Sequence, residues 1–229
     1  NGTIETAKAV TPQSLKAAYD SMLQDDTADI YVVGDIDVEE ITAKLRQVLP
    51  FGDREVHEKQ PKTEIDIKPE EYTKEQQEMK QGKLHIGFST PVYFGHPDFP
   101  KMQIFNGIFG GYAHSKLFMN VRERESLAYY ASSSYSSQYG LVFVTSGIEP
   151  SNEKKAIDVI NEQLKAMQNG EISDLELTQT KAMLTNQLKE ALDSARGQIE
   201  IYDQYKDLNE AFTIDTWASR WQQVTKEDV

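Results

Sequence analysis

The sequence contains no cysteine. Disulfide bonds, thiolate catalysis and cysteine-ligated zinc are therefore excluded for this chain. The absence of cysteine fits a cytoplasmic location, which is the prediction. No apolar run approaches the roughly 20 residues that a membrane-spanning helix needs, so no membrane span is predicted.

Basic residues are also scarce. Asp and Glu number 37 against 24 Lys and Arg, which gives a formal net charge of -13. Because a basic face supplies most of the affinity for nucleic acid, this charge argues against a nucleic-acid partner.

Metal-ligand patterns are missing as well. The four histidines are His57, His85, His96 and His114, and neither H-E-x-x-H nor H-x-x-E-H occurs. The sequence also has no Gly-x-Ser-x-Gly and no glycine-rich phosphate loop. We therefore predict no metal, no cofactor and no catalytic residue in this chain.

Apolar spacing predicts both helices and strands. Helical patterns cover 10–24, 38–49, 97–111, 115–125, 152–168, a long segment from Ser173 that is interrupted at Arg196-Gly197, and a last helix with Trp217 and Trp221. Strand patterns cover 29–35, 83–90 and a hairpin around Gln138-Tyr139-Gly140. This order predicts an α+β fold of two layers, with helices on one face of a mainly antiparallel sheet.

Three helix starts have clear caps, at Thr11-Pro12, at Asp37 and at Ser173. The segment from 53 to 80 is about half charged and predicts a linker, with a short edge strand at "TEIDI". In the first hairpin strand, period-2 alternation predicts one shared face for four residues: Tyr129, Ala131, Ser133 and Tyr135.

Two similar stretches stand near the ends of the chain, "AVTPQSL" (9–15) and "QVTKEDV" (223–229). Both are typical of a helix cap and first turn. Either capped helix starts resemble each other by chance, or the chain spans one period of a twofold repeat.

The stretch "NVRERESLAYY" (120–130) passes from charged to apolar residues. Read locally, Arg122 and Glu125 form an i,i+3 ion pair on an exposed helix end, worth a few tenths of a kcal/mol. The alternative is that Arg122 and a following tyrosine contact a ligand.

"IFNGIFGGYAHSKLFMNVRERESLAYYASSS" (104–134) resembles the signature of the pitrilysin/insulinase-type zinc metallopeptidases. The matching residues are Gly110-Gly111, Ser115, Leu117-Phe118, Val121-Arg122 and Leu127-Ala128-Tyr129. "YVVGDIDVEEI" (31–41), "GIEPSNEKKAIDVI" (147–160) and "GEISDLELTQTKAMLTNQL" (170–188) extend the resemblance over most of the chain.

This resemblance implies two homologous α+β domains of the mitochondrial-processing-peptidase type, which enclose a chamber. The first domain holds zinc through H-x-x-E-H and a downstream glutamate. The second is zinc-free and contributes an arginine and a tyrosine seven residues apart to the substrate and the oxyanion. Arg122 and Tyr129 match that pair.

By the same resemblance, residues 1–52 are the last helix-strand-helix unit of a first domain. Residues 53–81 are a linker, and 82–229 are a second domain that lacks its own last unit. Residues 1–52 can instead pack with the second domain as one permuted domain. The chain begins at Asn1 rather than Met, so we expect the natural start to lie upstream.

The resemblance leaves three functions open. The first is the zinc-free, substrate-contacting half of a metalloendopeptidase that binds extended peptides, with zinc on another domain or a partner subunit. The second is a non-catalytic assembly subunit, and the third is a general acidic binding domain. Either H-x-x-E-H lies upstream of Asn1, or the protein is an inactive bacterial member that works beside an active partner in a dimer or hetero-oligomer. The latter is favoured.

Overall fold

The structure is a computed structural model that describes residues 2–49, 51, 71–75, 81–206, 208 and 213–229. The chain divides into two compact units, Asn1–Gln60 and Pro61–Val229. Each unit is described by itself.

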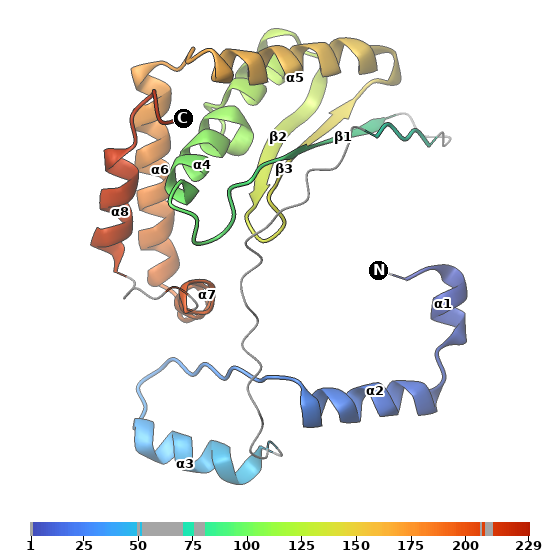
Figure 1. The fold of residues 1–229 in the computed structure, drawn as a ribbon, viewed down its shortest axis with the longest axis vertical. Coiled ribbons are helices and arrows are strands. Elements are labelled where there is room, and N and C mark those ends of the chain that lie inside the picture. Colours follow the sequence, from blue (N-terminus) through green and yellow to red (C-terminus); the bar gives the residue numbers. More distant parts are fainter. Residues whose placement is uncertain (1, 50, 52–70, 76–80, 207, 209–212) are drawn as a thin grey trace. The chain divides into compact units, whose positions relative to one another are not determined.

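The first unit contains three helices, α1 (Ile4–Ala9), α2 (Pro12–Asp25) and α3 (Val38–Val48) (Figure 1). The helices predicted at 10–24 and 38–49 are confirmed, and α1 was not predicted. Thr11 caps α2 by accepting a hydrogen bond from the backbone N of Ser14 at 3.1 Å. Asp37 caps α3 in the same way, from the backbone N of Glu40 at 2.8 Å.

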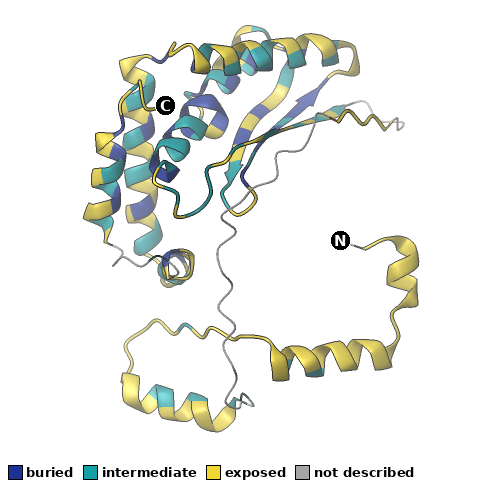
Figure 2. Ribbon diagram, in the orientation of Figure 1, coloured by how far each residue is buried: buried dark blue, intermediate teal, exposed yellow. Residues whose placement is uncertain are grey.

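The strand predicted at 29–35 is wrong: these residues form no strand in the structure. A strand needs a neighbouring strand for its backbone hydrogen bonds, and the structure shows no such pairing for this segment. Its apolar side chains are correspondingly exposed, with Ile30 at 49% and Val32 at 44%. None of the three helices buries a residue either, as Figure 2 shows.

The second unit is built on a three-stranded antiparallel sheet in the order β1-β3-β2. The strands are β1 (Gly82–Ser89), β2 (Ala128–Ser136) and β3 (Leu141–Ile148). The strand predicted at 83–90 and the predicted hairpin are both confirmed. The hairpin turn ends at Gly140, whose φ of 58° lies in the left-handed region that glycine favours.

Helices cover one face of this sheet (Figure 1), so the predicted two-layer α+β architecture is confirmed. The helical segments are α4 (Phe99–Asn106), the π-helical η1 (Gly107–Gly111) and η2 (Leu117–Arg124), the 3-10 turn η3 (Pro150–Asn152), α5 (Glu153–Gln168), α6 (Asp174–Leu192), α7 (Ala195–Tyr205) and α8 (Ile214–Gln223). In the described part of the chain, no helix combines the length and the apolar character that crossing a membrane requires.

The sequence predicted regular helices over 97–111 and 115–125, but both contain π-helical turns. Gly110 lies directly against β2, where an added Cβ would come within 2.5 Å of the backbone N of Ser133. The helix can approach the strand this closely only with glycine at this position.

The predicted interruption of the long helix is confirmed, but it lies slightly earlier than Arg196-Gly197. The chain leaves α6 at Asp193, and Ser194 caps α7 by accepting a hydrogen bond from the backbone N of Gly197 at 3.0 Å. The cap satisfies a backbone group that would otherwise be free at the helix start.

An aromatic cluster joins α4, α7 and α8. The ring of Trp217 lies 4.7 Å from that of Tyr205 and 5.9 Å from that of Phe99, measured between centroids. Trp217 is only 4% exposed. This packing holds the C-terminal helices against the rest of the unit.

We expect Trp217→Ala to lower the free energy of unfolding by about 3–5 kcal/mol, because the substitution leaves a large cavity in this cluster. Urea denaturation followed by circular dichroism measures the change. Tyr202→Ala, at a side chain that is 57% exposed on α7, is the matched control and should change stability by less than about 0.5 kcal/mol. Equal effects of the two variants would contradict a structural role for the cluster.

Candidate functional site

Arg122 lies near the end of η2, a segment anchored by the buried side chains of Leu117 and Val121. The guanidinium carbon lies 4.6 Å from the centre of the Phe118 ring, and Nε lies 3.5 Å from a carboxylate oxygen of Glu123. The side chain is 41% exposed. The cation–π contact with the ring therefore restrains the guanidinium, which still has donors available to a ligand.

The local interpretation of Arg122 as the partner of Glu125 is wrong. Glu125 instead accepts a hydrogen bond from Nζ of Lys155 on α5 at 2.9 Å. That hydrogen bond lowers the pKa of the Glu125 carboxyl. The sequence could not reveal this pairing because Lys155 lies 30 residues further along the chain.

A tight turn connects η2 to β2. Ser126 has a φ of 51°, in the left-handed region that non-glycine residues seldom adopt. The backbone N of the next residue, Leu127, donates to the carbonyl of Val121 at 3.0 Å. The turn thus fixes the start of β2 relative to the end of η2.

Tyr129 lies at a β-bulge. The pairing with β3 passes from Ala128 opposite Ile148 directly to Tyr130 opposite Gly147, so Tyr129 has no partner on β3. The prediction that Tyr129 shares a face with Ala131 is wrong, since Tyr129 is 58% exposed and Ala131 is 3% exposed. The extra residue breaks the alternation and turns the Tyr129 side chain towards solvent.

Arg122 and Tyr129 thus occupy the end of η2 and the start of β2, and both are available to a ligand. Within the described residues, the Tyr129 hydroxyl makes no hydrogen bond. Neither residue lines the two clefts described next. The contacts with substrate and oxyanion that the resemblance implies for these two residues stay a prediction.

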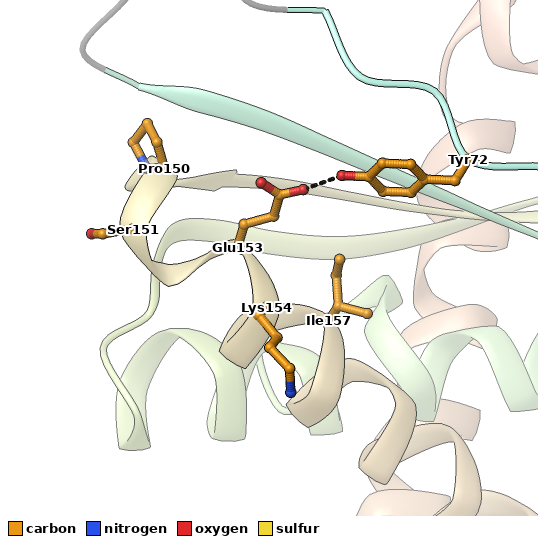
Figure 3. Close-up of a pocket in the computed structure, with 6 residues that line it drawn as sticks. All are labelled: Tyr72, Pro150, Ser151, Glu153, Lys154 and Ile157. Atoms are coloured by element: carbon orange, nitrogen blue, oxygen red, sulfur yellow. Dashed lines mark hydrogen bonds between the residues drawn. The ribbon is translucent and has the colours of Figure 1, made fainter.

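The first cleft, of about 380 Å³, lies at the start of α5 (Figure 3). The hydroxyl of Tyr72 donates to Oε1 of Glu153 at 2.5 Å, and Lys74 pairs with the other carboxylate oxygen. The hydrogen bond to Glu153 raises the pKa of Tyr72, and the hydrogen bond from Lys74 lowers the pKa of Glu153. These contacts anchor residues 71–75 to α5, which is a structural role.

The second cleft, of about 340 Å³, lies among α4, η1, α6, α7 and the end of β2. Most of its lining is amide, hydroxyl or aromatic, and none of it is charged: Phe99, Gln103, Asn106, Gly107, Gly111, Tyr112, Ser133, Ser134, Tyr135, Ser137, Leu184, Gln187 and Gln204. No sequence pattern predicted this site. The available signal was weak, namely the spacing of Gln103 and Asn106 on one face of a helix.

This cleft does not fit zinc. Gln103, Asn106 and Gly107 have the spacing of H-x-x-E-H, but neutral amides stand where imidazole and carboxylate are needed. Gly107 offers no side chain, and an added Cβ would clash with Thr180. Among the residues that the structure describes, no group of three or more His, Cys, Asp or Glu could hold a metal ion.

A three-stranded antiparallel sheet with helices on one face defines a two-layer α+β domain. Residues 9–184 match the family profile of the peptidase M16 inactive domain. The chain therefore belongs to the peptidase M16 inactive domain family, as its resemblance to the pitrilysin/insulinase-type peptidases implied.

Known relatives agree with this assignment. YmfF of Bacillus subtilis, a probable inactive metalloprotease, is 39% identical over the whole chain, which spans 54% of that protein. A conserved protein from Enterococcus faecalis V583 is similar in structure, with 39% identity and a TM-score of 0.87 over 99% of this chain and 54% of the other. A peptidase M16 inactive domain from Pseudomonas fluorescens shares the fold at 19% identity, with a TM-score of 0.72 over 99% of this chain and 55% of the other. The chain thus spans about half the length of these relatives.

Tyr112, which lines the second cleft, provides a pH-dependent test of this site. Burial raises its pKa from 10.0 to about 12. Because the folded state holds the proton more tightly, this contribution to stability is present below pH 10 and is lost as the pH rises through 12.

We expect unfolding measurements between pH 9 and about 12 to show a smaller loss of stability in Tyr112→Phe than in the unchanged protein. Tyr139→Phe, at an exposed position in the hairpin turn, is the control and should behave as the unchanged protein. An identical pH dependence for Tyr112→Phe would show that Tyr112 is not buried as described.

Proposed function

We propose that this chain is the zinc-free, substrate-contacting half of a metalloendopeptidase. It binds extended peptides and supports their hydrolysis at a zinc site on another domain or on a partner subunit. The observation that carries the proposal is the bulge that turns Tyr129 to solvent, close in sequence to the exposed Arg122. Bulges often re-aim side chains beside functional sites.

The two side chains have distinct roles in this proposal. The guanidinium of Arg122 is a permanent cation with several donors, suited to a peptide carbonyl. The hydroxyl of Tyr129 donates a hydrogen bond to the oxyanion that forms as the peptide bond is attacked. The setting is cytoplasmic, and the partner in the dimer or hetero-oligomer is a homologous zinc-bearing domain or subunit.

An alternative is a non-catalytic subunit used for assembly. The observation in its favour is the first unit, whose three helices bury no residue. Apolar side chains such as Leu15, which is 63% exposed, and Val33, which is 40% exposed, require a partner surface.

We also propose the domain division expected from the resemblance, with 1–52 as a closing unit, 53–81 as a linker and 82–229 as a second domain. The two similar helix starts support a repeat. The backbone N of Thr11 donates to Oγ of Ser14 at 2.9 Å, and that of Thr225 donates to Oδ2 of Asp228 at 2.9 Å. The two stretches thus share the bond from a threonine N to the side chain three residues further on, but Thr11 caps α2 whereas residues 226–228 form a turn.

Residues 29–35 form no strand in the structure, but docking of the closing unit onto a sheet would supply the neighbouring strand that they lack. Docking therefore predicts protection of this segment from hydrogen exchange. Paired strand amides should exchange at least about a hundredfold more slowly than an unpaired chain. Hydrogen exchange with mass spectrometry of the whole chain measures this. If the protection is lost when the protein is diluted, the closing unit docks onto a second copy of the chain, because only docking between molecules depends on concentration. Exchange at the unpaired rate at every concentration would contradict docking in either form.

The catalytic proposal predicts that Tyr129→Phe lowers the rate of peptide cleavage about 10²–10³-fold, because one oxyanion donor is lost. Arg122→Ala should weaken substrate binding and raise KM. Cleavage is measured with the full-length protein, alone and mixed with a candidate zinc-bearing partner.

Two controls test whether these effects are specific. Arg124→Ala removes a neighbouring side chain that is 75% exposed, and Tyr139→Phe removes a hydroxyl from a turn residue that is 66% exposed. Neither should change the rate. If Arg122→Ala and Tyr129→Phe also leave it unchanged, the roles assigned to Arg122 and Tyr129 are wrong.

A further inference from the structure

The uncharged cleft among α4, α6, α7 and β2 has a set of hydrogen-bond donors that no role described so far uses. At about 340 Å³ it falls within the roughly 300–1,000 Å³ range of small-ligand pockets. Its side-chain amides come from three different helices, with Gln103 on α4, Gln187 on α6 and Gln204 on α7. Polar groups that converge from separate elements are a mark of a binding site.

The orientation of the Gln103 amide is fixed by the core. Nε1 of Trp221 donates to Oε1 of Gln103 at 2.9 Å, and the indole nitrogen can only donate. The oxygen of Gln103 must therefore face Trp221, which is 3% exposed. The NH2 group is left without a hydrogen-bond partner among the described residues.

Two further amides are held in the same way. Oδ1 of Asn106 accepts from the hydroxyl of Ser133 at 2.8 Å, and Oε1 of Gln187 accepts from the hydroxyl of Tyr112 at 2.7 Å. Neither NH2 group has a hydrogen-bond partner within the described part of the chain. Each amide that lines the cleft on α4 or α6 thus has an internally bonded oxygen and a free donor.

The NH2 donors and the lack of charge in the lining indicate which kind of ligand fits this cleft. A strongly charged anion would find no counter-charge in the lining. Neutral carbonyl oxygens match the NH2 donors, and the rings of Phe99 and Tyr135 offer apolar contact beside them. The hydroxyls of Ser133 and Ser137 and the side chain of Gln204 supply further polar groups in the lining.

We propose that this cleft is a second peptide-binding site, which holds an uncharged segment by its main-chain carbonyl oxygens and is separate from Arg122 and Tyr129. The choice of a peptide as the ligand rests on the proposed function. The site would hold part of a long substrate away from the scissile bond.

The test titrates an N-acetylated, C-amidated hexapeptide of alanine and glutamine into the whole chain labelled with ¹⁵N. The side-chain NH2 signals of Gln103, Asn106 and Gln187 report directly on the three donors. We expect these signals to shift on binding. The Kd that these three cleft signals report should be the same in Arg122→Ala and Tyr129→Phe, even though those variants weaken the separate site at Arg122 and Tyr129.

Variants that replace one side-chain NH2 group by an oxygen test each donor separately. Gln187→Glu keeps an oxygen to accept from Tyr112 but replaces the free NH2 by a second oxygen. Gln103→Glu does the same beside Trp221. Each should weaken peptide binding about tenfold, because a donor becomes an acceptor that repels the carbonyl. Gln179→Glu is the control, with the same charge change at an exposed position on α6, and should leave the Kd unchanged.

Several results would overturn the proposal. One is the absence of any shift in the three NH2 signals at millimolar peptide, and another is equal weakening by Gln187→Glu and Gln179→Glu. A shift with chitotriose but not with the peptide would make the occupant a sugar. Loss of binding in Arg122→Ala would show that the cleft is not separate. The peptide could still bind in the cleft while Arg122→Ala and Tyr129→Phe leave the cleavage rate unchanged. That result would refute the proposed function but not the peptide site in the cleft.

Discussion

The helices of the second unit are held in place by the single apolar face of a narrow sheet. On this face the central strand β3 presents Val142, Val144 and Ile148, each at most 3% exposed. Three strands cannot enclose a core by themselves, so the helical layer has to supply the other half. Ile104 on α4 and Ile108 on η1 are among the side chains of that layer that are 0% exposed.

Close packing on this face also determines where the candidate site residues lie. Gly110 permits η1 to approach the backbone of β2 near Ser133. The chain then returns through η2 and the left-handed turn at Ser126 before it enters β2. The bulge at Tyr129 follows immediately, where the pairing with β3 begins. The exposure of Tyr129 is therefore a consequence of how the helical layer joins the sheet.

The first unit has the opposite character, because its described helices carry apolar stripes but bury no residue. Its helices carry good caps at Thr11 and Asp37, so local sequence is enough to start and stop them. Local signals do not supply a surface on which Leu15, Tyr19 or Val33 can be buried. Most helical stability in proteins comes from tertiary packing, which the helices of this unit do not supply to one another.

Sequence alone determined the features that depend on short-range chemistry. Most of the helices, the caps at Thr11, Asp37 and Ser173, the hairpin and the family signature around Arg122 and Tyr129 could be predicted, because each depends on residues a few positions apart. The strand at 29–35 was predicted wrongly, since strand formation depends on a neighbour that local pattern cannot supply. The tertiary structure decided the rest. It placed Lys155 beside Glu125, put Tyr129 on a bulge, and gathered Gln103, Asn106 and Gln187 around one cleft. These arrangements join elements far apart in the chain, where side-chain packing rather than sequence spacing sets the contacts.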